Sequence, residues 1–128
     1  MKNQLEQIKL AAMAALQNNQ THYAPNQGTA SLRNAVAEYE TARGNNTKPE
    51  NVLVTIGACH ALFTALFGIL NPGEEVIIPT PCFVCYEPLC KMTGAIPVIV
   101  ETRNEDKFKL TPELLESAIT DKTKMLVL

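Results

Sequence analysis

The stretch Val52-Leu53-Val54-Thr55-Ile56-Gly57-Ala58-Cys59 decides the fold, because it predicts a strand that turns directly into a helix. Val52-Leu53-Val54 is short, apolar and β-branched at both ends, as in a buried strand, and Gly57 permits the sharp turn that follows. Apolar residues then recur at helical spacing over residues 58–69, and Asn71-Pro72-Gly73 ends the helix. This pattern is typical of one unit of an α/β fold.

The turn at Gly57, Ala58 and Cys59 is a candidate anion site. The N–H groups of a first helical turn have no acceptor within the helix, and they lie at the positive end of the helix dipole. A phosphate group fits such a position. Most strand-to-helix turns bind nothing, however, so the turn by itself also fits a purely structural role.

Composition places the chain among ordinary globular proteins. It has 128 residues, of which 46% are hydrophobic and 19% charged, enough for one domain or part of one. A net charge of −2 without a Lys/Arg cluster argues against nucleic acid or an anionic membrane as a partner. No apolar run approaches the roughly 18 residues that span a bilayer, and no signal peptide is visible, so we expect a cytoplasmic location.

The four cysteines allow two interpretations. Cys82-x-x-Cys85, with Cys90 close by, is compatible with a metal or redox module. A zinc site would need a second Cys/His pair at matching spacing, which His22 and His60 do not supply. We therefore predict no metal site, and reduced, mostly buried thiols at Cys59 and at the three positions above.

The remaining pattern alternates strands with helices. Helices are predicted over residues 5–16, 29–43, 83–92 and from Thr111, and further buried strands over 75–79, 96–100 and 124–128. Thr111 and Pro112 form a good helix start, with a capping side chain followed by proline. With the strand at 52–54, four strands alternate with helices, which predicts a three-layer α/β/α domain with a mainly parallel sheet.

Both ends of the sequence suggest a piece of a larger domain. Met1 opens directly on the helix at 5–16, without a leading strand or arm, and the chain stops on the strand Met125-Leu126-Val127-Leu128. Parallel strands are normally covered on both faces by elements that follow them. The chemistry of open α/β sheets lies at the carboxyl ends of the strands, where this sequence stops.

Five motifs, in order, resemble the class I/II, fold-type I aminotransferases, which use pyridoxal 5′-phosphate (PLP). They cover nearly the whole chain. The motifs are Tyr23-x4-Gly28-x3-Leu32-Arg33-x-Ala35-Val36-Ala37, Val54-Thr55-Ile56-Gly57-Ala58-x-x-Ala61-Leu62, Leu70-Asn71-Pro72-Gly73-Glu74-Glu75-Val76, Pro79-x-Pro81-x-Phe83-x-x-Tyr86 and Gly94-Ala95-x-Pro97-Val98.

The resemblance implies roles for five residues. Gly57, Ala58 and Cys59 match the turn whose backbone N–H groups hold the PLP phosphate. Phe83 matches the aromatic residue that stacks on the pyridine ring, where the family often has Trp or Tyr. Tyr23 matches the tyrosine whose hydroxyl reaches the phosphate of the neighbouring subunit, which implies a homodimer.

Structural roles remain open for these aromatic residues. Phe83 also fits a core aromatic, and Tyr23 a loop residue anchored by its ring. We take Tyr86 as a core residue, and Arg33 as a surface or structural cation, which its place in the Leu-Arg motif also allows to form a packing salt bridge.

The same resemblance shows what these 128 residues do not provide. The family reaction needs a lysine that the cofactor binds covalently, a carboxylate on the pyridine nitrogen and arginines for the substrate carboxylates. None of the lysines lies in a matching motif: Lys48, Lys91, Lys107, Lys109, Lys122 and Lys124. We therefore interpret residues 1–128 as part of the PLP-binding large domain, lacking the N-terminal arm and all segments after the fourth strand.

We expect the isolated chain to be inactive and the parent to transfer an amino group between an amino acid and a 2-oxo acid. The alternative is a non-catalytic relic that binds a phosphate ligand or dimerises. The sequence does not indicate which amino acid is the amino donor. It is also compatible with a parent enzyme of the same fold that catalyses a lyase reaction.

Overall fold

A computed structural model describes residues 2–128, with side chains from Leu5 onward, and the chain divides into two compact units. The first unit ends at Val54, and the second runs from Thr55 to Leu128. Met1, which precedes the helix predicted over residues 5–16, lies outside the described residues. No helix of the described part is long and apolar enough to cross a membrane.

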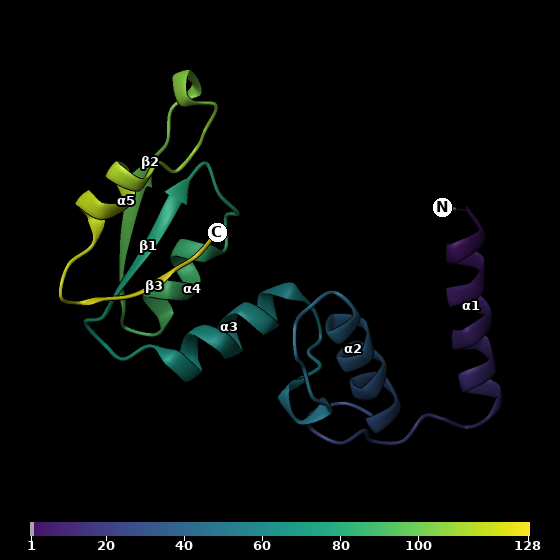
Figure 1. The fold of residues 1–128 in the computed structure, drawn as a ribbon. Helices are drawn as coiled ribbons and strands as arrows, with labels where there is room; N and C mark the ends of the chain where they lie inside the picture. The colour runs from purple at the N-terminus through teal and green to yellow at the C-terminus, as the bar shows by residue number, and fades with distance from the viewer. Residues whose placement is uncertain (1) are drawn as a thin grey trace. The chain divides into compact units, whose positions relative to one another are not determined.

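The first unit contains helix α1 (Lys2–Gln17), helix α2 (Ala30–Ala42) and the short 3-10 helix η1 (Pro49–Asn51) (Figure 1). Both predicted helices are confirmed. The apolar side chains on the predicted face of α1 are exposed, however, at Leu5, Ile8 and Leu16. Within the described chain this face is therefore not part of a hydrophobic core.

Residues 52–54 do not form the predicted strand. Val52 closes the 3-10 turn of η1, and Val54 donates its backbone N–H to the Gln27 carbonyl at 3.1 Å. Gly28 adopts φ +96°, and a Cβ placed on it would lie 2.5 Å from Cγ2 of Val54. The segment therefore meets the loop before α2 through Val54, whose side chain contacts Gly28 instead of a neighbouring strand.

The second unit contains a three-stranded parallel sheet in the order β2-β1-β3. The strands are β1 (Glu75–Thr80), β2 (Ile96–Glu101) and β3 (Thr123–Leu126). Ile77 lies opposite Val98 on one side and Leu126 on the other. The sheet confirms three of the four predicted strands.

The core lies on the central strand. Val76, Ile77 and Ile78 are fully buried, because β1 is paired along both edges and covered on both faces. A continuous run of β-branched residues is what such a strand requires. Leu66, Leu70 and Cys90 pack into the same core.

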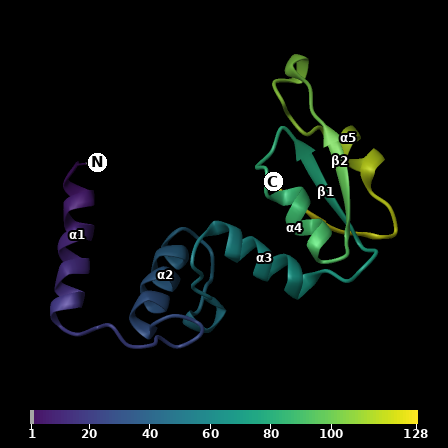
Figure 2. The ribbon, with the colours of Figure 1, turned by 180° about the vertical axis from the view of Figure 1, so that it is seen from behind.

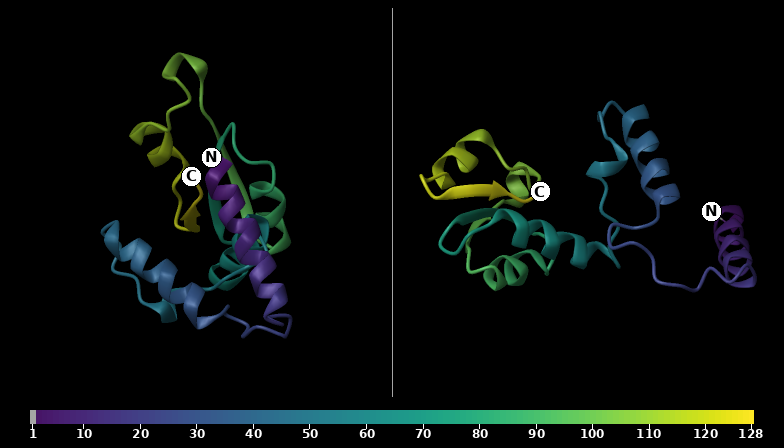
Figure 3. Two further views of the ribbon diagram at one scale, coloured as in Figure 1. Left: turned by 90° about the vertical axis from the view of Figure 1, so that its right-hand side faces the viewer. Right: turned by 90° about the horizontal axis from the view of Figure 1, so that it is seen from below.

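Helices cover both faces of this sheet, as predicted. Helix α4 (Tyr86–Met92) packs on β1 and β2, and α3 (Ala58–Ile69) packs against α4. Helix α5 (Pro112–Ala118) packs on β2 from the opposite face (Figures 2 and 3). The Thr111 hydroxyl caps α5 by accepting the N–H of Leu114 at 3.3 Å. The three-layer α/β/α arrangement is therefore present within this unit.

Helix α4 starts later than predicted. The prediction began it at Phe83, but the helix begins at Tyr86, and the Tyr86 N–H donates to the Phe83 carbonyl in a turn. Pro79 lies within β1 and Pro81 lies in the bend directly after it, so Phe83 falls in the loop after β1. This places its ring at the carboxyl end of the sheet, where it can meet a ligand.

Candidate functional site

A cavity of about 350 Å³ lies at the carboxyl ends of the three strands. The chain that follows each strand contributes to its wall, as the topology of a parallel sheet requires. Figure 1 shows the loops after β1 and β2 extending beyond the arrowhead of β1. The lining residues are Pro79, Pro81, Cys82, Phe83, Tyr86, Thr102, Phe108, Leu110, Val127 and Leu128.

Two aromatic rings form one side of this cavity. Phe83 and Tyr86 meet edge to face, with centroids 5.7 Å apart and ring planes at 73°. Tyr86 packs against the hydrophobic core, as predicted, whereas Phe83 is 47% exposed. Phe83 is therefore not a core residue, and its ring is available to contact a flat ligand.

The turn before α3 has the geometry of an anion site. Gly57 is the N-cap at φ +129°, a conformation that suits glycine, and no side chain caps the helix. A Cβ placed on Gly57 would meet nothing within 4 Å, so the turn is not covered beside the Gly57 Cα. The first N–H groups of a helix have no acceptor within it, so those of Ala58 and Cys59 are the candidate donors to an anion.

Neighbouring side chains brace this turn. The Thr55 hydroxyl donates to the Gly57 carbonyl at 3.1 Å, and the Ile56 N–H donates to Nδ1 of His60 at 3.4 Å. His60 thereby links the chain before the turn to the first turn of α3. The sequence offered no clear signal for this role of His60.

A sulfur contact joins the turn to the aromatic side of the cavity. The Cys59 thiol lies 3.7 Å from the Cys85 thiol, and Cys85 is the residue immediately before α4. Since Cys85 lies between Phe83 and Tyr86, the Gly57 turn adjoins the segment that carries both rings. Of the predicted site residues, Phe83 lines the cavity, whereas Gly57, Ala58 and Cys59 lie in the turn that contacts Cys85.

The prediction of mostly buried cysteines is wrong. Cys59 and Cys82 are exposed and Cys85 is half-buried, while Cys90 alone among the four is buried. The reason is topological, since Cys82 lies in the loop after β1, and Cys59 and Cys85 lie at helix starts. All four are free thiols, and within the described chain no three metal-binding side chains gather.

The surroundings of two thiols change their acidity. The hydrogen bond with Cys59, followed by burial, raises the pKa of Cys85. Burial raises the pKa of Cys90 as well. Both groups are therefore held in the protonated form at neutral pH.

Tyr23 lies in the other unit, in the loop between α1 and α2. Its side chain is fully exposed, at 107% of its reference area, and does not anchor the loop by burial. With Thr21 and His22 it borders a shallow surface hollow. Its predicted contact with a cofactor phosphate stays a prediction.

Arg33 is a structural cation, as predicted. One guanidinium nitrogen donates to Oε1 of Gln27 and to the Pro49 carbonyl, each at 3.2 Å. Arg33 thereby ties helix α2 to the loop before it and to η1.

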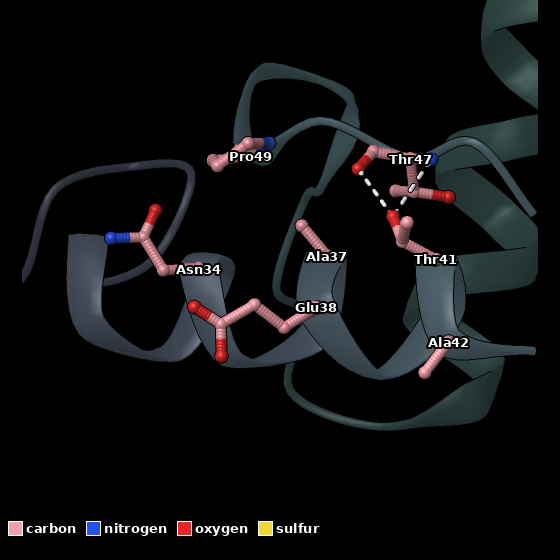
Figure 4. Close-up of a pocket in the computed structure, with 7 residues that line it drawn as sticks. All are labelled: Asn34, Ala37, Glu38, Thr41, Ala42, Thr47 and Pro49. Atoms are coloured by element: carbon pink, nitrogen blue, oxygen red, sulfur yellow. Dashed lines mark hydrogen bonds between the residues drawn. The ribbon is translucent and has the colours of Figure 1, made fainter.

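A second hollow, of about 480 Å³, lies between α2 and η1 within the first unit (Figure 4). The Thr41 hydroxyl donates to the Thr47 carbonyl at 3.1 Å and accepts the Thr47 N–H at 3.4 Å. The walls are otherwise small or apolar, and Glu38 is the single titratable side chain among the lining residues. This hollow offers no acid–base pair, so the sheet-end cavity is the better candidate.

Sequence reasoning missed several residues of the cavity wall. Phe108 and Lys107 adopt φ +55° and +54°, which is uncommon for residues with a side chain. Hydrogen bonds to the Arg103 and Asn104 carbonyls hold this tight loop after β2. No local sequence pattern predicts that Phe108 lines the cavity, because its position depends on how the loop after β2 folds back over the sheet edge.

The arrangement agrees with a known family. The sequence model for "Aminotransferase class I and II" matches residues 1–128. The chain belongs to this aminotransferase family. An aspartate aminotransferase of Bacillus subtilis is 42% identical over 119 residues, which cover 92% of this chain and 30% of the relative.

Solved structures of the family agree with the aminotransferase fold of this chain. The Thermus thermophilus aspartate aminotransferase with maleate matches with a TM-score of 0.93 and 41% identity, over 96% of this chain and 32% of that one. An aromatic aminotransferase of Pyrococcus horikoshii matches with a TM-score of 0.91 and 41% identity, over 94% of this chain and 33% of that one. The chain therefore spans about a third of the length of these relatives, and the predicted fold class is confirmed.

Proposed function

We propose that this chain is part of the cofactor-binding large domain of a PLP-dependent aminotransferase, which moves an amino group between an amino acid and a 2-oxo acid. The observations that carry the proposal are the exposed Phe83 ring at the sheet-end cavity and the contact of Cys59, in the turn after Gly57, with Cys85, two residues after Phe83. Family membership supports the same reaction class.

The two parts of this site fit the two ends of the cofactor. The N–H groups of Gly57, Ala58 and Cys59 would hold the phosphate, which the helix dipole also favours. Phe83 would lie against the pyridine ring and limit its tilt through dispersion contacts. When bound, PLP withdraws electrons from the substrate and so weakens the bonds at its α-carbon.

Tyr23 extends the proposal to a homodimer with shared sites. Its fully exposed hydroxyl is free to reach the phosphate held by a neighbouring subunit. The exposed apolar face of α1 is consistent with burial against a second copy. Sedimentation of the natural protein should show a dimer, and a monomer at micromolar concentration would contradict this part.

The reaction needs groups that we do not assign within residues 1–128. They are the covalent lysine, the carboxylate on the pyridine nitrogen and the arginines that hold substrate carboxylates. We therefore propose that these 128 residues alone are inactive. Relatives named for aspartate and for aromatic amino acids are equally similar, at 41% identity, so the proposal stops at the reaction class. The cytoplasmic location stays a prediction.

The test is a titration of the natural full-length protein with PLP, followed by circular dichroism in the absorption band of the cofactor. We expect a saturable signal, and inorganic phosphate should compete with it. Borohydride treatment should then leave the cofactor attached to a lysine outside the motifs quoted above. Saturable binding without such an attachment would instead support a non-catalytic phosphate binder, and no binding would contradict both.

A further inference from the structure

We propose that Cys59 and Cys85 form a redox-active thiol pair, which a small disulfide such as oxidised glutathione converts into an intramolecular disulfide. The proposal uses the side-chain sulfur of Cys59, whereas the proposed phosphate contact uses its backbone N–H. It does not depend on PLP being the cofactor.

The geometry of the two thiols carries the inference. Their sulfur atoms lie 3.7 Å apart, in contact, although the residues are 26 positions apart in the chain. Cys59 belongs to the first turn of α3, and Cys85 is the N-cap residue of α4, so packing of these helices holds the pair together. A disulfide needs a sulfur separation of about 2 Å, which modest side-chain rotation can approach from van der Waals contact.

Exposure decides which sulfur reacts first. Cys59 is exposed, whereas Cys85 is half-buried and its sulfur accepts the Cys59 S–H. The Cys59 thiolate therefore attacks one sulfur of the small disulfide, forming a mixed disulfide and releasing the first thiolate. The Cys85 thiol then gives its proton to solvent and its sulfur attacks the Cys59 sulfur, which displaces the second thiolate.

The small disulfide is the only oxidant that this thiol–disulfide exchange needs. The protein gives up two electrons and two protons, and one molecule of the small disulfide becomes two molecules of thiol. The reverse reaction with excess thiol restores both cysteines. The new bond would tie the start of α3, and hence the Gly57 turn, to the start of α4.

The other two cysteines serve as internal comparisons. Cys82 is exposed and forms a C-x-x-C pattern with Cys85, which makes it the competing partner suggested by the sequence. Cys90 is fully buried in the core and is closed to the reagent. The structure places Cys59, not Cys82, against Cys85.

The test treats the reduced natural full-length protein with oxidised glutathione, blocks remaining thiols and maps disulfides by peptide mass spectrometry. We expect a peptide containing Cys59 linked to one containing Cys85, and loss of this link in Cys59→Ser and in Cys85→Ser. The matched control Cys82→Ser should keep the link. In Cys85→Ser, Cys59 should retain glutathione, because no second thiol displaces it.

Mapping of the unaltered protein decides the question even if a serine variant folds poorly. The oxidised protein should also show a higher midpoint of thermal unfolding, which excess dithiothreitol reverses. A predominant Cys82–Cys85 link, a link between two protein molecules, or stable glutathione on Cys59 in the unaltered protein would each overturn the proposal.

Discussion

Phe83 meets the ring of Tyr86 edge-on, with the centroids 5.7 Å apart, so that a core residue supports an exposed one. Tyr86 is fixed by its packing on the core, and its contact with Phe83 orients the Phe83 ring in the wall of the sheet-end cavity. An exposed ring held in this way loses little rotamer freedom when a flat ligand lies against it.

The first prediction concerns this ring. Phe83→Ala should weaken PLP binding by roughly 3- to 10-fold, since an aromatic stacking contact contributes about 0.5–1.5 kcal/mol. Phe83→Tyr should keep most of the affinity. The matched control is Phe67→Ala, which removes another exposed aromatic ring, from the distal part of α3. Equal affinities for Phe83→Ala and the unaltered protein would argue against stacking.

The second prediction compares two glycines near and within α3. Gly57 has φ +129°, so Gly57→Ala should lower the free energy of unfolding by about 1–3 kcal/mol through backbone strain. Gly68 lies inside the helix with open space around it, so Gly68→Ala should raise the free energy of unfolding by about 0.5–1 kcal/mol. Urea unfolding measures both, and effects of the same sign would contradict the described turn.

The third prediction separates a steric clash from backbone strain. Gly28 and Gly44 have nearly equal φ values, +96° and +95°, but only at Gly28 would a Cβ collide with Val54. Gly28→Ala should therefore destabilise the protein by about 1–3 kcal/mol more than Gly44→Ala. The added Cβ would meet both Cγ2 and Cβ of Val54, so adding Val54→Gly should reduce that difference, and a difference unaffected by Val54→Gly would refute the described contact.

The fourth prediction concerns pH. The Asn71 N–H donates to Oε2 of Glu74 at 2.7 Å, and this hydrogen bond lowers the pKa of Glu74 below its ordinary value of 4.5. A carboxyl whose pKa is lower in the folded state stabilises the fold above its unfolded pKa, and this contribution is lost as the pH falls through the folded value. Glu74→Gln should therefore be less stable at pH 7.

The difference between Glu74→Gln and the unaltered protein should shrink as the pH drops below 4.5. Thermal unfolding midpoints across this range measure it. The matched control is Glu105→Gln, in the exposed turn η2 (Asn104–Asp106), which should behave like the unaltered protein at every pH. A stability gap for Glu74→Gln that persists at low pH would show that the hydrogen bond is not the cause.

Much of the second unit could be predicted from the sequence, because local signals and the final contacts agree there. The run Val76-Ile77-Ile78 predicts a strand buried on both faces, and Thr111 with Pro112 predicts the start of α5. Gly57 predicts the turn that precedes α3. Each of these signals acts within a few residues of its effect.

Other features depended on contacts that no local pattern contains. Val52-Leu53-Val54 has the composition of a strand, but Gly28 and Gln27 provide its contacts, so tertiary packing overrides β-propensity. Phe83 fits an amphipathic helix, yet the helix starts three residues later. The contact between Cys59 and Cys85 arises from the packing of two helix starts, whereas the sequence suggested the spacing of Cys82 and Cys85.

The most direct test of the proposed function is a half-reaction with the natural full-length protein loaded with PLP. An amino acid, such as aspartate or an aromatic one, is added without any 2-oxo acid, and the absorption of the cofactor is followed. We predict conversion of PLP to its pyridoxamine form, with one equivalent of the matching 2-oxo acid released per site. A loaded protein whose cofactor stays unchanged with every amino acid tested, or which releases ammonia and leaves PLP unchanged, would contradict the proposed amino-group transfer.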